Sequence, residues 1–146
     1  MSFRRPKSLK EVARLARRGG EFHARLREFL DTFYSVPTTR RAAIAEEPAP
    51  TGDAIQDVYL AAAAEHLALS YGLPIPAWVH GSGRFLRDAH FAGPDGMKAI
   101  LLAESPASFR RRMLFVDFDP LSRPRRRGRK PSPPPWGPSR IKPTAS

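Results

Sequence analysis

The sequence predicts an all-α fold: a compact bundle of four to six helices over residues 1–121, crossed by an extended Pro/Trp strap and followed by a disordered tail at 122–146. Apolar side chains recur at helical spacing in several segments. Capping residues, prolines and glycines bound these segments, and almost none alternates apolar and polar residues as a strand does. The length of 146 residues suits one domain rather than two.

Two helices are expected near the N-terminus. Ser8 and Glu11 form a capping box, in which the Ser8 hydroxyl accepts a hydrogen bond from the Glu11 amide, and the Gly19–Gly20 pair ends or kinks the helix that follows. The second helix is expected to end at Pro37. Its apolar residues lie at i, i+4, i+7, i+8 and i+11 and form one stripe: Phe22, Leu26, Phe29, Leu30 and Phe33.

A short helix is expected between Thr38 and Glu47, and the strongest helix between Asp53 and Tyr71. Asp53 lies near the N-cap of that long helix, and Gly72 is a natural residue just past its end. Apolar residues cover most of its circumference, so it should be the central helix, packed on at least two sides. His66 lies on its apolar face and is interpreted as a core histidine.

The second half of the chain is expected to be less regular. Leu73–Val79 contains two prolines and Trp78, and it reads as an extended strap with Trp78 as its anchor. Ser105 followed by Pro106 fits an N-cap and a first helical position, so a short helix is expected to run to Arg112. Residues 113–118 are either a short strand or a second strap.

The formal net charge of +11 is unevenly distributed. Residues 1–41 contain 11 basic and 4 acidic residues, whereas residues 42–109 contain 3 and 8. Residues 122–146 contain eight basic residues, seven prolines and no acid, so they cannot form a core and are expected to be disordered. These segments could pair within one molecule or contact two partners. The tail is either a nucleic-acid or acidic-surface arm or a dispensable extension.

Several classes of protein are excluded by composition. The absence of cysteine excludes disulfide scaffolds, thiolate metal sites and cysteine nucleophiles. No apolar run reaches the roughly 18 residues that a membrane span needs, so no membrane association is expected. The N-terminus lacks the apolar core of a signal peptide, and the expected location is the cytoplasm.

The sequence gives little support for an enzyme. None of the four histidines has metal-ligand spacing. Asp117 and Asp119 could hold a divalent cation, as in a small nuclease, but a polar strand edge before a turn is the favoured interpretation. The segment Gly81–Arg84 could meet a phosphate, yet a lone Gly-x-Gly is a weak signal. No catalytic residue, metal or cofactor is therefore predicted.

Partner-binding residues are predicted at Arg110, Arg111, Arg112 and Trp78. Guanidinium groups can bind carboxylates or phosphates in a forked geometry. Three consecutive helical residues, about 100° apart, cannot share one face, so at least one of these arginines should turn inward to an acid. The alternative interpretation is a solvated helix end with favourably placed cations.

A nucleic-acid-binding surface is the alternative prediction. Lys10, Arg14 and Arg17 lie at i, i+4 and i+7, so they share a helix face that could follow phosphates. A helix-turn-helix over Ser8–Leu30 is disfavoured, because the turn reads Arg-Arg-Gly-Gly and the second helix lacks a polar face that would read bases.

Two segments carry a family resemblance: Tyr59–Trp78 (YLAAAAEHLALSYGLPIPAW) and Leu101–Phe115 (LLAESPASFRRRMLF). They resemble an uncharacterised family of small, actinobacterial-type proteins with Gly-Leu-Pro-x-Pro-x-Trp and Ser-Pro-x-x-Phe-Arg-Arg-Arg motifs. The resemblance covers about residues 22–119 and attaches no catalytic role to the motifs. It implies a gene beside a nucleotidyltransferase-like partner, in an arrangement like a toxin–antitoxin pair. The expected function is therefore that of a small non-enzymatic helical protein that binds a partner protein, with an antitoxin-like role as one form of it.

Overall fold

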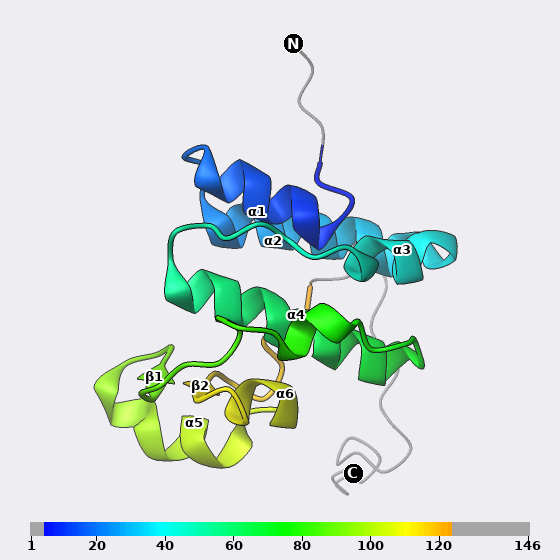
Figure 1. Cartoon of the computed structure of the whole chain (residues 1–146). Helices are drawn as coiled ribbons and strands as arrows, with labels where there is room; N and C mark the ends of the chain where they lie inside the picture. The colour runs from blue at the N-terminus through cyan, green and yellow to red at the C-terminus, as the bar shows by residue number, and fades with distance from the viewer. Residues whose placement is uncertain (1–4, 124–146) are drawn as a thin grey trace, which may run out of the picture.

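The computed structural model describes residues 5–123 and confirms the all-α prediction (Figure 1). This part of the chain contains six α-helices, three short 3₁₀ helices and two strands of two residues each. The helix α4 lies between two groups of elements, with α1, α2 and α3 on one side and α5, α6 and the strands on the other (Figure 1). The tail predicted at 122–146 falls almost entirely outside the described residues.

The first two helices, α1 (Leu9–Arg17) and α2 (Phe22–Ser35), pack against each other. The Ser8 hydroxyl accepts from the Glu11 amide at 3.1 Å, as the capping box predicts. The Glu11 carboxylate accepts from the Lys7 amide at 2.6 Å. All five apolar residues of the predicted stripe on α2 are buried, which fixes the face that α2 turns toward the core.

The chain then turns through η1 (Pro37–Thr39) into the short helix α3 (Arg40–Ala45). The Arg40 guanidinium donates hydrogen bonds to the carbonyls of Phe33 and Tyr34, both at 2.9 Å. It also lies over the ring of Tyr71, 4.4 Å from its centroid. Arg40 therefore satisfies carbonyls that the end of α2 leaves free, and it links α2 to the end of α4.

The central helix α4 (Ala54–Tyr71) begins and ends as its sequence predicts. The Asp53 carboxylate accepts from the amides of Ile55 and Gln56 at 2.9 and 3.1 Å. Gly72, with φ +64°, ends the helix in the left-handed conformation that favours glycine. Ten of its residues are buried, so α4 packs on several sides, as expected. His66 is only partly buried and meets the ring of Phe109 at a centroid distance of 6.1 Å.

After α4, the Pro/Trp strap runs into η2 (Ala77–His80). Trp78 is buried, and its indole Nε1 donates to the Ile44 carbonyl of α3 at 3.0 Å. The strap is thus anchored through Trp78, as predicted. The segment that follows, residues 81–89, is irregular.

The remaining elements form the far side of the molecule: β1 (His90–Phe91), η3 (Asp95–Met97), α5 (Lys98–Glu104), α6 (Ala107–Arg110) and β2 (Leu114–Phe115). The two strands pair in parallel, with His90 opposite Leu114 and Phe91 opposite Phe115.

Two details of the predicted short helix are wrong, its N-cap and its last residue. Ser105 does not cap α6, which ends at Arg110 rather than Arg112. The buried Ser105 hydroxyl instead accepts from the Val116 amide at 2.8 Å. The Ser-Pro pair predicts a hydrogen bond between the Ser105 hydroxyl and the first turn of α6. In the structure this hydroxyl instead bonds to a residue that follows α6 in the chain.

Candidate functional site

The arginine triplet 110–112 occupies three different environments. Arg112 has no exposed surface, and it donates from Nη1 to Glu65 and from Nη2 to the Val79 carbonyl at 2.8 Å. Arg111 donates to the second carboxylate oxygen of Glu65 at 3.0 Å, with 47% of its side chain exposed. Arg110 is exposed. The prediction that at least one arginine turns inward to an acid is confirmed.

The four predicted partner-binding residues do not form one exposed surface. Arg112 and Trp78 lie in the interior, where their polar groups bind other parts of the same chain. Arg110 and the outer side of Arg111 lie on and just after α6, on the opposite side of α4 from α1 (Figure 1). The surface that this triplet can offer to another molecule is therefore that of these two arginines.

Arg84, which the sequence places in a possible phosphate loop, is instead a structural residue. Its side chain is 4% exposed, and it donates to the carbonyls of Asp57 and Pro48 at 3.0 and 2.8 Å. Its guanidinium also lies 4.8 Å from the centroid of the Trp78 ring. Because these contacts hold the loop before α4 against α4 itself, the guanidinium points into the protein rather than toward a ligand.

The pair Asp117 and Asp119, considered above as a possible cation site, has the geometry of a turn. Asp117 and Asp119 are both exposed, and the Asp119 amide donates to Asp117 Oδ1 at 3.3 Å. Among residues 5–123, no three His, Asp or Glu side chains come close enough together to hold a metal ion. Within the same residues, no helix combines the length and apolar character needed to cross a bilayer.

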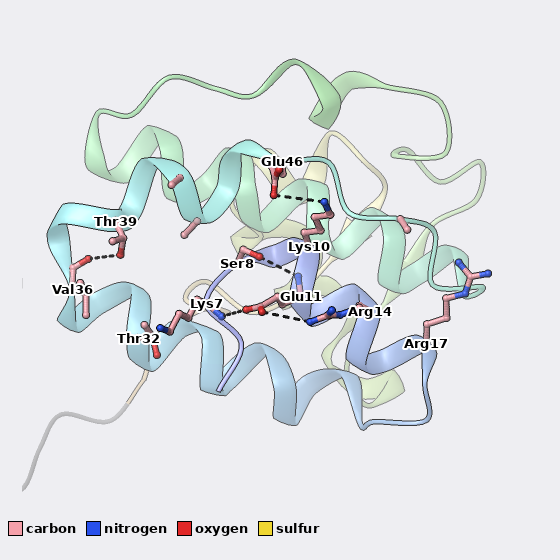
Figure 2. Close-up of a pocket in the computed structure, with 13 residues that line it drawn as sticks. Lys7, Ser8, Lys10, Glu11, Arg14, Arg17, Thr32, Val36, Thr39 and Glu46 are labelled. Carbon is pink, nitrogen blue, oxygen red and sulfur yellow. Dashed lines mark hydrogen bonds and ion pairs between the residues drawn. The ribbon is translucent and has the colours of Figure 1, made fainter. Parts of the chain in front are cut away.

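A groove of about 760 Å³ lies between α1, the end of α2 and α3 (Figure 2). Its surface is mostly apolar, because alanines and the aliphatic stems of lysine and arginine contribute to it. We call it the α1–α3 groove, and its lining residues are Lys7, Ser8, Lys10, Glu11, Arg14, Arg17, Thr32, Val36, Thr39, Ala42, Ala43, Glu46 and Ala49.

The structure brings Lys10, Arg14 and Arg17 together on this groove, as their spacing predicts. Lys10 Nζ lies 3.8 Å from Glu46 Oε1, so this pair bridges α1 and α3 (Figure 2). Arg14 Nη2 lies 3.5 Å from Glu11, and Arg17 donates to the Pro50 carbonyl at 3.1 Å. All three side chains remain exposed.

The groove carries an excess of positive charge. Its lining includes four cations and two carboxylates, which gives a net formal charge of +2. The Lys10–Glu46 pair is 56% and 68% exposed, so water screens it and the pair contributes little stability. An incoming carboxylate could therefore replace Glu46 as the partner of Lys10 at small cost.

Sequence reasoning missed the α3 wall of the groove. Ala42 and Ala43 line it, and the sequence showed them only as small residues in a weakly periodic segment. Lys7 also lines the groove, although the sequence places it only within the basic N-terminal region of residues 1–41. Small residues on α3 indicate a groove only when it is known that α3 packs beside the basic helix α1. The sequence alone does not show this packing.

Comparisons with protein-family models, with curated proteins and with solved structures found no match to this chain. The family suggested by the two motif segments therefore stays a prediction.

Proposed function

We propose that this protein is a non-enzymatic helical binding protein, and that its α1–α3 groove holds an acidic helical segment of a partner protein. One observation carries the proposal: a single groove combines a mostly apolar surface with four cations, three of which share one face of α1. A helix with apolar residues on one side and carboxylates beside them complements both features.

The apolar surface would supply most of the affinity. Ala42 and Ala43 have short side chains, which leave room for the larger apolar side chains of an incoming helix. Burying one leucine-sized side chain contributes about 1.5–3 kcal/mol before the costs of association. From Lys10 to Arg17 the groove follows α1 for about 10 Å, or roughly two helical turns of a partner.

The cations would supply orientation and a fast encounter. Charge complementarity raises association rates and disfavours wrong partners more than it adds affinity. Lys10 can exchange Glu46 for a carboxylate of the partner, because the existing pair is exposed and weak. Arg14 and Arg17 lie farther along the same face and would meet carboxylates one and two turns away.

Nucleic-acid binding through Lys10, Arg14 and Arg17 is the alternative. Their shared, exposed face on α1 favours it. The apolar surface between them favours a protein instead, since phosphates gain nothing from contact with alanine and valine. The nucleotidyltransferase-like partner of an antitoxin-like pair, implied by the family resemblance, is the first protein to test.

Site-specific photo-cross-linking distinguishes these possibilities. A benzophenone amino acid replaces Ala42 in the groove, or Ala103 on α5 as a matched exposed position, and each variant is irradiated in an extract of the native organism. The groove probe should form a cross-link to one protein, at a segment rich in Asp, Glu and apolar residues. Lys10→Glu with Arg14→Glu should abolish the cross-link, whereas Arg87→Glu with Lys98→Glu should leave it unchanged.

Other results would overturn the proposal. A cross-link that disappears after nuclease treatment would assign the groove to nucleic acid. The groove would not be the binding site if the Ala103 probe captured the same protein equally well. The same conclusion would follow if the cross-link persisted in the variant with Lys10→Glu and Arg14→Glu.

A further inference from the structure

One strongly exposed aromatic side chain lies between two carboxylates shortly after β2. Phe118 is 71% exposed, more than any other large apolar side chain of residues 5–123. Asp117 and Asp119 flank it, and both are exposed. Within the described part of the chain, neither carboxylate has an ion-pair partner. We call residues 117–119 the acidic turn, and both its ring and its charges are open to another molecule.

The acidic turn is fixed to the protein on both sides. Before it, Val116 is buried, and its amide donates to Ser105 Oγ at 2.8 Å. After it, Leu121 is buried, and its carbonyl accepts from the Tyr34 hydroxyl at 2.8 Å. Because its flanks are already ordered, the turn loses less conformational entropy on binding than a free segment would.

The chemistry of the acidic turn complements that of the α1–α3 groove. The groove combines a mostly apolar surface with a net formal charge of +2, whereas the turn combines one aromatic ring with two negative charges. The groove volume of about 760 Å³ leaves room for a phenyl ring. Its cations and the apolar surface beside them therefore suit the carboxylates and the ring of the turn.

The spacing of the charges also agrees. Lys10 and Arg14 lie on the groove one turn of α1 apart, about 6 Å along the helix axis (Figure 2). The Cα atoms of Asp117 and Asp119 are two residues apart, which is at most about 7 Å. Each carboxylate can therefore pair with one of these cations while Phe118 lies against the apolar surface.

The acidic turn does not occupy the groove of its own chain. None of its residues lines the groove, and the ring of Phe118 is exposed. One chain thus has two complementary surfaces at separate places. Such surfaces allow one copy to bind another through a heterologous contact, in which each copy contributes a different surface.

We propose that the α1–α3 groove of one copy binds the acidic turn of a second copy, so that self-association competes with the partner protein. This inference rests on the proposed function, because both occupants use the same groove. The turn contributes one aromatic ring, whereas a partner helix contributes contacts along about two turns. Self-association should therefore be the weaker of the two and should yield to the partner.

Sedimentation velocity of the full chain tests the inference, at concentrations from about 5 to 500 μM. The weight-average mass should rise with concentration at about 50 mM salt, and the rise should shrink at about 300 mM, because salt screens the charges. Phe118→Ala should weaken the association at least about tenfold. Leu102→Ala, at an exposed apolar position on α5, should leave it unchanged.

Mixing two charge variants tests which surfaces meet. Lys10→Glu with Arg14→Glu reverses the groove, and Asp119→Lys reverses one charge of the turn while Asp117 can still accept from the amide of residue 119. Each variant alone should stay monomeric. An equimolar mixture should associate again, because each copy supplies the surface that the other lacks. The control Asp88→Lys, at an exposed position elsewhere, should associate like the wild type.

Four results would overturn the inference. A chain that stays monomeric at the highest concentration excludes self-association, and an equal effect of Leu102→Ala removes the role of Phe118. Association that persists in the groove variant, or a mixture of the two charge variants that stays monomeric, would show that groove and turn do not meet. A monomeric chain would leave the cross-link to a partner protein intact, whereas failure of that cross-link would leave the sedimentation results unchanged.

Discussion

Arg112 and Glu65 form a salt bridge in the interior of the protein, although they lie 47 residues apart in the sequence. Arg112 follows α6 and Glu65 belongs to α4, so the bond links the central helix to the far side of the molecule. Arg111 shares the same carboxylate from the surface. One acid therefore compensates a fully buried cation and a half-exposed one.

Removal of one partner of the Arg112–Glu65 salt bridge should lower the free energy of unfolding far more than removal of an exposed arginine. Glu65→Gln leaves Arg112 buried without a counterion, and we expect a loss of about 3–5 kcal/mol in the free energy of unfolding. Arg110→Gln should stay within about 0.5 kcal/mol of wild type. Urea denaturation followed by circular dichroism measures both. The double variant Glu65→Leu with Arg112→Met should recover part of the loss, and a mild effect of Glu65→Gln alone would show that the buried cation does not need this acid.

Trp78 should stabilise the fold through one hydrogen bond as well as through packing. Trp78→Phe keeps an aromatic ring but removes the Nε1 donor, which leaves the buried Ile44 carbonyl without this partner. It also weakens the face on which the Arg84 guanidinium lies. We expect a loss of about 1–3 kcal/mol in the free energy of unfolding.

The control for Trp78→Phe is Phe118→Leu, at an aromatic side chain that is 71% exposed. This change should be nearly neutral in the same urea titration. Equal effects of the two substitutions would mean that the indole N–H contributes nothing measurable.

The parts of this fold that the sequence predicts are those set by interactions between residues close together in the chain. Ser8, Asp53 and Gly72 act on backbone groups within a few residues, so their roles as helix boundaries are readable without the rest of the chain. The apolar stripe of α2 is equally local, because its period of 3.6 residues is a property of one helix.

The candidate site depends on contacts that no local pattern encodes. The sequence indicates that one of three consecutive arginines must face inward, but it cannot say that Arg112 is the one or that Glu65 is its partner. Arg84 looked like part of a phosphate loop, and its actual partners, at Pro48 and Asp57, lie far earlier in the chain. The meeting of Arg5 and Arg123 on Asp31 is likewise a result of tertiary packing.

His66 should make the stability of the protein depend on pH. Burial lowers the pKa of His66 below its usual value near 6.5, although the charge of Asp119 partly opposes this shift. The unfolded chain then binds a proton more readily than the folded one, so this contribution to stability is fully present above about pH 6.5 and is lost as the pH falls through the folded pKa. Urea denaturation at several pH values between about 7.5 and 5 should show a flatter profile for His66→Gln than for wild type. Parallel profiles would contradict the prediction.

Glu46 should compete with carboxylates of the partner protein for Lys10 in the α1–α3 groove. Its carboxylate pairs with Lys10, so Glu46→Gln frees this lysine and increases the positive charge of the groove. With the cross-linked partner segment as a labelled peptide, we expect binding roughly two- to five-fold tighter, which corresponds to an exposed ion pair of at most about 1 kcal/mol. Glu104→Gln, an exposed position on α5, makes the same change in net charge and should leave the affinity unchanged. If both variants tighten binding equally, the partner senses the total charge of the protein, and Lys10 has no specific role in the groove.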